Sequence, residues 1–373
     1  LTKSGKIDAA GGMAYVSSLT DKVPTSANVD YYAKIVLDQS VRRSLIKISS
    51  EIKAESFDET KESRMVLEEV EQKIFKLTDV NQSSRVLPMS DIIPETIKLI
   101  DTRYKNKNSF SGIPSGFTDL DSMTSGFQNS EMIIIGARPS MGKTALALSM
   151  IQNIAIERKI PCGFFSLEMS RLQIGQRLLS QVARVQGTKL RNGMLKIEDF
   201  KKLQDAGGEC YDAPLYIVDV PNMKLLDLRA MARRMRVNQK VEIIFIDYIG
   251  LITSENTDAP VYEQQSAISK SLKSLARELD IPIVVLCQVA RTAEGNEPGL
   301  AELRGSGSIE QDADMVMFIH GDRNKNKSSN EGYDPVQDRK LIVAKQRNGP
   351  IGDVDVLFLS SYTKFENKSK ERE

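Results

Sequence analysis

The chain has 373 residues, a length that suits two domains better than one. Hydrophobic residues make up 40% of it, aromatic residues only 6%, and tryptophan does not occur, so we expect an aliphatic core such as a buried parallel sheet has. The 51 basic and 50 acidic residues nearly cancel, which argues against a surface coated in nucleic acid and confines any DNA contact to a few loops.

Metal, disulfide and membrane sites are not indicated. Cys162, Cys210 and Cys287 are isolated, and His320 is the single histidine, so no Cys/His spacing could hold a metal. The plain interpretation is reduced thiols in a cytoplasmic protein. No signal-peptide pattern or membrane-spanning apolar stretch occurs. Because the first residue is Leu1 rather than methionine, we expect a fragment that lacks its beginning.

Residues 1–80 are predicted to form a partial N-terminal helical domain. Apolar residues recur near helical spacing in two segments, with a break between them at Ser56-Phe57-Asp58: Val36, Leu37, Val41, Leu45 and Ile48, then Val66, Val70 and Ile74. This pattern predicts an antiparallel helical hairpin. A hairpin of this size has too little core to be stable alone.

Residues 81–112 read as a linker rich in Asn, Ser, Pro and Lys. Within it, Ser90 is predicted to cap a short helix that has Pro94 in its first turn. Ile93, Ile97 and Ile100 would form one narrow apolar stripe. The stripe predicts a docking helix, and the sequence leaves open whether it docks on its own domain or on another surface.

Residues 113–373 alternate between short apolar runs and helical stretches. Runs that do not alternate are typical of strands buried on both faces: Met132–Ile135, Gly163–Leu167, Leu215–Val218, Ile243–Ile246 and Ile283–Leu286. The order predicts an α/β domain with a doubly wound, mostly parallel sheet. Lys340–Ala344 and Val354–Leu359 flank Asn348-Gly349-Pro350 and predict a terminal hairpin.

A phosphate-binding loop follows the first of these strands. It comprises Gly136, Ala137, Arg138, Pro139, Ser140, Met141, Gly142, Lys143 and Thr144, and a helical pattern follows it. Ala137 stands where the usual first glycine lies. Backbone N–H groups at the helix N-terminus would cradle phosphates, Lys143 would reach the β and γ oxygens, and Thr144 would coordinate Mg²⁺. A chance match in a turn is the alternative.

Polar residues end three neighbouring strands. Asp247 ends an apolar strand where NTPases hold Mg²⁺, although an ordinary turn aspartate would look the same. Tyr248 follows it in place of a glutamate, so the catalytic base must come from elsewhere. Glu168 is the candidate base, and Gln288 is a candidate γ-phosphate sensor, because carboxyl ends of parallel strands converge. A first-turn glutamate and plain strand-end polarity are the alternatives.

Five ordered segments together resemble the bacterial replicative helicases of the DnaB type over residues 110–365. These are the phosphate-binding loop, Phe165–Met169, Ile246–Leu251, Ser306–Asp314 and Ala344–Pro350. Residues 10–45, with Gly11-Gly12 and Asn28–Ala33, are similar to the N-terminal domain of that family. The resemblance implies an ATP-driven replicative DNA helicase with a RecA-like P-loop motor domain.

The resemblance also implies roles for particular residues. The motor would assemble as a ring of six with ATP and Mg²⁺ bound between neighbours, Glu168 as base and Gln288 as phosphate sensor. Lys345 and Arg347 match the cation pair that reaches the neighbour's γ-phosphate. Arg304, Gly305 and Gly307 match a channel loop that follows single-stranded DNA, and Arg177 matches a further phosphate contact, which we assign to DNA.

Two departures from the family pattern concern the DNA contacts. Gly305 stands where the family often has glutamate, and Ala290 replaces an asparagine in the segment after Gln288. The family further implies primase and a helicase loader as partners, and a linker helix that grips the adjacent motor. Two other classes remain as alternatives, a recombinase that forms RecA-like filaments and a non-motor ATP switch such as a loader or a clock-type ATPase.

Overall fold

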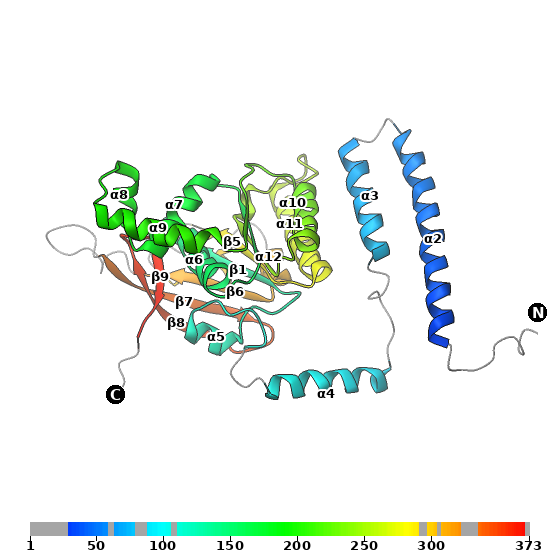
Figure 1. Ribbon diagram of the computed structural model, residues 1–373, viewed down its shortest axis with the longest axis horizontal. Helices are drawn as coiled ribbons and strands as arrows, with labels where there is room; N and C mark the ends of the chain where they lie inside the picture. Colours follow the sequence, from blue (N-terminus) through cyan, green and yellow to red (C-terminus); the bar gives the residue numbers. More distant parts are fainter. Residues whose placement is uncertain are drawn as a thin grey trace, which may run out of the picture. The chain divides into compact units, whose positions relative to one another are not determined.

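The computed structural model describes residues 29–58, 63–78, 88–105, 110–290, 297–303, 307–321 and 335–369 (Figure 1). It divides into two units, Leu1–Ile92 and Ile93–Glu373. The domain boundaries predicted after residues 80 and 112 stay predictions. In the described part of the chain, no helix is both long and apolar enough to cross a membrane.

The first unit contains the predicted pair of helices. α2 (Val29–Ser56) and α3 (Ser63–Thr78) pack against each other as a hairpin (Figure 1). Lys73 of α3 ties the two together, with its Nζ 2.6 Å from Glu55 Oε1 and 3.5 Å from Glu51 Oε2. The predicted helical hairpin is therefore confirmed.

Helix α4 (Met89–Lys105) begins earlier than the sequence predicted. Ser90 lies inside its first turn, where the hydroxyl donates to Asp91 Oδ1 at 3.3 Å, so its prediction as the cap was wrong. Pro94 accordingly lies past the first turn, inside the helix. The predicted stripe of Ile93, Ile97 and Ile100 is exposed on this chain.

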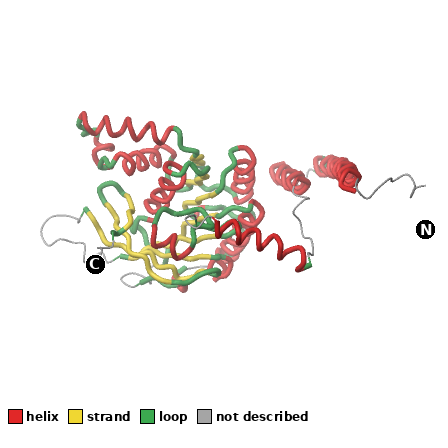
Figure 2. Tube along the Cα trace, turned by 60° about the horizontal axis from the view of Figure 1, so that its bottom comes forward, coloured by secondary structure: helices red, strands yellow, loops and turns green. Residues whose placement is uncertain are grey.

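The second unit is built on a nine-stranded sheet in the order β3-β2-β4-β5-β1-β6-β7-β8-β9. Figure 1 draws its strands as arrows, and Figure 2 shows them in yellow beside the red helices. From β3 to β6 all neighbours are parallel, and from β6 to β9 they are antiparallel. The strands are β1 (Met132–Ala137), β2 (Cys162–Ser166), β3 (Leu215–Val218), β4 (Ile243–Asp247), β5 (Ile283–Gln288), β6 (Met315–His320), β7 (Val336–Gln346), β8 (Gly352–Leu359) and β9 (Lys364–Asn367).

Helices cover both faces of the parallel part. The α-helices of this unit are α5 (Thr118–Thr124), α6 (Lys143–Ile151), α7 (Arg171–Ala183), α8 (Gly187–Asn192), α9 (Ile197–Tyr211), α10 (Leu225–Asn238), α11 (Val261–Leu279) and α12 (Gly307–Asp312). Ile133 and Ile135 of β1 share one core cluster with α6. Strand side chains alternate, so Ile134 faces the other side, where α11 contacts β1 and β5. This doubly wound arrangement is the predicted fold.

All five predicted parallel strands and the terminal hairpin are present. The hairpin pairs β7 with β8 around Asn348-Gly349-Pro350, and β7 begins four residues before the predicted Lys340. β6 and β9 were not predicted from the sequence. A π-helical turn, Gln152–Glu157, continues α6, and short 3₁₀ turns lie at Ile249–Leu251 and Leu300–Glu302.

A buried carboxylate fixes the loop at the start of the second unit. Asp121 of α5 is 2% exposed. It accepts hydrogen bonds from Ser115 N and Ser115 Oγ, both at 2.7 Å, and from Gly116 N at 3.0 Å. These bonds hold the loop before α5 in a closed turn.

We predict that Asp121→Asn destabilises the second unit by about 1–3 kcal/mol, because the amide NH₂ of the new side chain would face a backbone N–H, which would then lack an acceptor. The measurement is the midpoint of denaturant unfolding. Asp205→Asn on the exposed face of α9 is the matched control, and its free energy of unfolding should change by less than about 0.5 kcal/mol. Equal midpoints for both variants would contradict this role of Asp121.

Candidate nucleotide site

The loop after β1 has the backbone of a phosphate-binding loop. Ser140 and Gly142 have positive φ angles of 65° and 92°, and α6 begins at Lys143. A Cβ atom on Gly142 would lie 2.8 Å from Phe365 Cε2, so the close packing of β9 against the loop requires glycine there. The N–H groups that begin α6 are free of helical partners and can receive phosphate oxygens.

The rest of the loop is anchored to the core. A Cβ on Gly136 would lie 2.7 Å from the Phe318 ring. The Arg138 guanidinium donates to Val289 O at 2.9 Å, and the Met141 side chain is buried. Of the predicted loop residues, Met141 can therefore offer a phosphate only its backbone, whereas the exposed Pro139 and Ser140 form the tip of the loop.

Lys143, Thr144 and Asp247 come together as predicted. Thr144 Oγ1 donates to Asp247 Oδ2 at 2.6 Å, and Lys143 Nζ is 3.5 Å from Asp247 Oδ1. The Lys143 ammonium also lies 4.1 Å from the centroid of the Tyr248 ring, a cation–π contact that the sequence analysis missed. The Lys143 ammonium is thus positioned by the carboxylate of Asp247 and by the ring of Tyr248.

The donor set fits a magnesium ion that arrives with a nucleotide. Asp247 is fully buried, and its Oδ1 accepts no hydrogen bond from any described residue. No group of three or more His, Cys, Asp or Glu residues gathers in the described part of the chain, so no all-protein cage is offered there. Mg²⁺ typically takes one or two carboxylates together with substrate phosphates, which one aspartate and one hydroxyl can complement.

Glu168 and Gln288 lie at the same edge of the sheet as the loop. Ser166 is in register with Asp247, and Leu167 N donates to Asp247 O at 2.8 Å, so Glu168 directly follows a residue that contacts the end of β4. Gln288 is in register with Ala137 at the start of the loop. Both side chains are exposed. A phosphate bound by the loop would lie beyond the carboxyl ends of the same strands.

Arg177 has the charged neighbours of the nucleotide site. Burial lowers the pKa of its guanidinium, and the negative charges of Asp247 and Glu168 act in the opposite direction. It lines a cavity of about 430 Å³ formed by α7, α8 and the turn between β8 and β9. The DNA contact of Arg177 stays a prediction, and in the structure the guanidinium lies near the carboxylates of Asp247 and Glu168.

Lys345 and Arg347 lie at the opposite edge of the sheet. β7 runs antiparallel to β6, so Gln346 pairs with Met315, the first residue of β6, and Met315 pairs with Ile133 near the start of β1. The loop of the same chain lies beyond the other end of β1, which at six residues is about 16 Å long. The two cations therefore cannot reach phosphates bound by their own chain.

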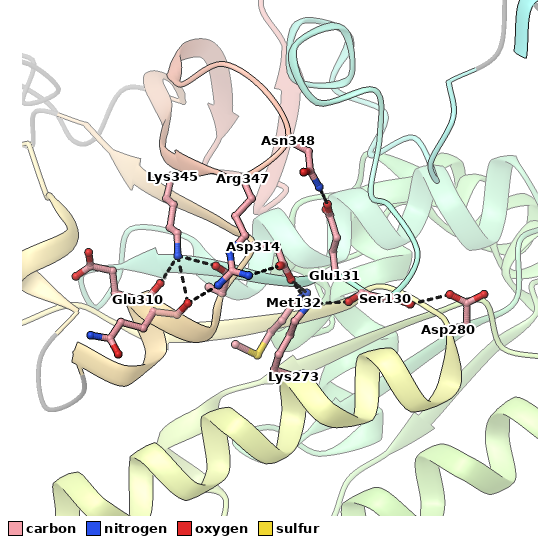
Figure 3. Close-up of polar contacts among 12 residues, drawn as sticks. Ser130, Glu131, Met132, Lys273, Asp280, Glu310, Asp314, Lys345, Arg347 and Asn348 are labelled. Carbon is pink, nitrogen blue, oxygen red and sulfur yellow. Dashed lines mark hydrogen bonds and ion pairs between the residues drawn. The ribbon is translucent and has the colours of Figure 1, made fainter. Parts of the chain in front are cut away.

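Both cations instead contact the end of α12 (Figure 3). Lys345 Nζ donates to Glu310 O at 2.5 Å and to Ala313 O at 2.8 Å, and Arg347 NH2 donates to Gln311 O at 2.6 Å. Of the predicted DNA-contacting residues, Gly307 begins α12, whereas Arg304 and Gly305 lie outside the described residues.

The fold and this site define a P-loop nucleotide hydrolase with a RecA-like motor domain. Residues 112–367 match the family model described as DnaB-like helicase C terminal domain, and residues 1–38 match the DnaB-like helicase N terminal domain. The chain belongs to the DnaB-like family of replicative helicases.

Known relatives agree with this assignment. The chain is 55% identical to the replicative DNA helicase DnaB of Treponema pallidum, over 97% of this chain and 80% of the relative. It is 40% identical to that of Geobacillus stearothermophilus, over 98% and 81%. A solved DnaB-like replicative helicase, described with its interactions with primase, superimposes with a TM-score of 0.73 at 28% identity, over 98% of this chain and 85% of that chain.

A second solved structure, described as an ATPase domain, is a further relative. It superimposes with a TM-score of 0.67 at 32% identity, over 74% of this chain and 99% of that domain. The protein is thus a replicative DNA helicase, an ATP-dependent enzyme, and this membership excludes the filament-forming recombinase and the non-motor switch.

We predict that Glu168→Gln abolishes steady-state hydrolysis and leaves nucleotide affinity within about twofold, because an amide cannot accept a proton from the attacking water but keeps the same shape. The measurements are phosphate release and binding of a fluorescent nucleotide. Glu198→Gln on the exposed surface of α9 is the matched control and should hydrolyse at the parental rate. Unchanged turnover in Glu168→Gln would assign the base to another residue.

Proposed function

We propose that the helicase works as a ring of six subunits in which each nucleotide is bound between two neighbours. The P-loop subunit supplies Lys143, Thr144 and Asp247, and the neighbour supplies Lys345 and Arg347. The single observation that carries this proposal is the separation of the two groups to opposite edges of one sheet. Two complete copies, arranged head to tail, provide what one copy lacks.

Exposed apolar surfaces support contact between copies. The stripe of α4 exposes Ile97 and Ile100 by 60% and 57%. On the motor unit, Met194, Ile197 and Phe200 around the start of α9 are exposed by 74%, 90% and 56%. Large exposed apolar patches are typical of sites where proteins contact one another. We assign the α4 stripe to the motor of an adjacent subunit, in line with the family resemblance.

ATP and Mg²⁺ are the proposed ligands of the loop. The N-terminus of α6 and Lys143 would hold the phosphates, and Thr144 with Asp247 would hold the metal, largely through water. The bound ion would neutralise charge on the phosphates. Glu168 would accept a proton from the attacking water, and Gln288 would hydrogen-bond the γ-phosphate and lose that bond on its release.

Cations supplied by the neighbour would act on the transition state. Charge that develops on the γ-phosphate oxygens is stabilised by preorganised positive groups. Because Lys345 and Arg347 lie together at the end of one strand and share contacts with α12, a shift of one subunit would add or remove both cations together. Hydrolysis would in this way be coupled to movement between subunits.

The product of that movement is translocation on single-stranded DNA. Arg304, Gly305 and Gly307 are the proposed backbone contacts, on the strength of the family pattern, and Arg177 is retained as a weaker candidate. Primase is a proposed partner because a structural relative is described in its interactions with primase. A helicase loader and a cytoplasmic location complete the proposal by resemblance to the family.

The trans arrangement predicts recovery of activity from two inactive proteins. Lys143→Ala subunits cannot bind phosphates productively but keep Arg347, and Arg347→Ala subunits have the converse defect. Mixed rings contain interfaces at which an intact loop faces an intact arginine. Since such arginines contribute about 10³–10⁵ in rate, even a minority of restored sites should raise ATP hydrolysis well above either parent.

Subunit exchange is first verified by energy transfer between differently labelled proteins. Full hydrolysis by Arg347→Ala rings alone would reject the trans arrangement. Mixtures that exchange subunits and yet stay at the level of the parents would reject it as well. Electron micrographs of the parental protein should show rings and no helical filaments.

We predict that Arg304→Ala weakens binding of single-stranded DNA and makes its salt dependence shallower, because each lost phosphate contact lowers the slope of log K against log salt by about 0.7. The measurement is fluorescence anisotropy of a labelled oligonucleotide at several salt concentrations. Arg234→Ala on α10 is the control and should keep the parental slope. A parental slope in Arg304→Ala would remove this residue from the DNA path.

A further inference from the structure

The two cations proposed to act in trans are held together on α12 within their own chain (Figure 3). Their partners there are the carbonyl oxygens of Glu310, Gln311 and Ala313. The last carbonyls of a helix lack helical partners and form the negative end of its dipole, so they attract Lys345 and Arg347. Burial and the positive charge of Arg347 lower the pKa of Lys345, as expected for two cations held close together.

A buried carboxylate, that of Asp314, stands directly behind Arg347. Arg347 N donates to Asp314 O at 2.9 Å, and Arg347 NH1 lies 3.6 Å from Asp314 Oδ1. The other oxygen, Oδ2, accepts from Met132 N at 2.8 Å and from Lys273 Nζ at 2.6 Å. Lys273 also donates to Ser130 O at 2.8 Å. Asp314 thereby links the start of β1, α11 and the arginine (Figure 3).

The side chains of Asp314 and Lys273 are much less exposed than that of Arg347. The side chain of Asp314 is 8% exposed and that of Lys273 is 20% exposed, whereas that of Arg347 is 48% exposed. An arginine whose backbone and guanidinium are already held by contacts loses less conformational freedom on binding a phosphate than an arginine that moves freely in solvent. A carboxylate fixed by two other donors is a suitable anchor for it.

We infer that Asp314 is a positioning residue for hydrolysis at the neighbouring subunit's site. Held by Lys273 and Met132, it directs Arg347, and through the shared end of α12 also Lys345, toward the outer edge of its own subunit. This inference rests on the proposed trans arrangement and adds to it the group that orients the arginine. Asp314 touches neither nucleotide nor DNA on this account.

A purely structural role for Asp314 makes a different prediction. If Asp314 only joined β1 to α11, its loss would weaken every function of the subunit that carries it. A positioning role instead confines the defect to the subunit's action on its neighbour. The subunit's own loop lies at the other end of β1, so its nucleotide binding should be unaffected.

The test places Asp314→Asn in one or the other member of the mixed rings. In the active interfaces, the Lys143→Ala subunit donates the arginine and the Arg347→Ala subunit donates the loop. Adding Asp314→Asn to the arginine donor should lower the recovered kcat by about tenfold to 100-fold, the usual effect of a misplaced catalytic group. Adding it to the loop donor should leave the recovered rate within about twofold, and KM for ATP should stay the same in both mixtures.

Asp121→Asn is the matched control, since it alters another buried aspartate of the same unit, remote from Arg347. It should give the same rate in either placement. If Asp314→Asn does not yield folded protein, Lys273→Gln enters the same design, because it leaves the carboxylate but removes its ammonium anchor.

Equal losses from both placements, or no loss from either, would overturn the positioning role and leave the trans arrangement intact. Mixed rings that exchange subunits but recover no activity even without Asp314→Asn would overturn the trans arrangement, and the positioning role with it. The two failures are therefore distinguishable.

Discussion

The common direction of the parallel strands is the constraint on which the rest of this motor depends. All carboxyl ends meet at one edge, where the loop, Asp247, Glu168 and Gln288 gather. The antiparallel β7 returns Lys345 and Arg347 to the other edge. The hydrogen-bonded strands between the two groups have a fixed length. No movement within one subunit can therefore bring Lys345 and Arg347 to the loop of the same chain. On the proposed mechanism, ATP hydrolysis therefore requires that subunits assemble.

Much of this arrangement could be predicted from the sequence, for reasons that are local. Strands buried on both faces are continuous apolar runs, and the P-loop carries its own glycine and lysine pattern, so five parallel strands and the loop were found correctly. Glu168 and Gln288 were proposed as site residues because they interrupt apolar runs at strand ends, and the structure places both at the edge of the sheet where the loop lies. β9 was missed because Phe365 is its only buried residue, and the charged Lys364 and Glu366 hide it. Ser90 was misassigned because a serine four residues ahead of a proline resembles a helix cap even where the helix begins one residue earlier, at Met89.

What the sequence could not predict are contacts between distant segments. Tyr248 supports Lys143 across more than 100 residues, and Lys273 holds Asp314 across 41. Asp314 looks like any acidic residue before a strand, since its partners come from β1, α11 and the end of β7. The sequence likewise did not predict that Arg177 lies near Asp247 and Glu168, because this depends on how α7 lies beside the sheet.

The packing of Phe365 against Gly142 has a consequence for how the protein is made. More than 200 residues separate the two, and Phe365 N also donates to Ser149 Oγ on α6 at 2.9 Å. A ribosome therefore releases the phosphate-binding sequence long before it releases the strand that supports it. Asn367, also in β9, donates to Gly116 O at 2.9 Å, so the strand also contacts the segment that begins the motor domain in the sequence. An unfinished chain therefore has the phosphate-binding sequence without the strand that packs against Gly142 and bonds to α6.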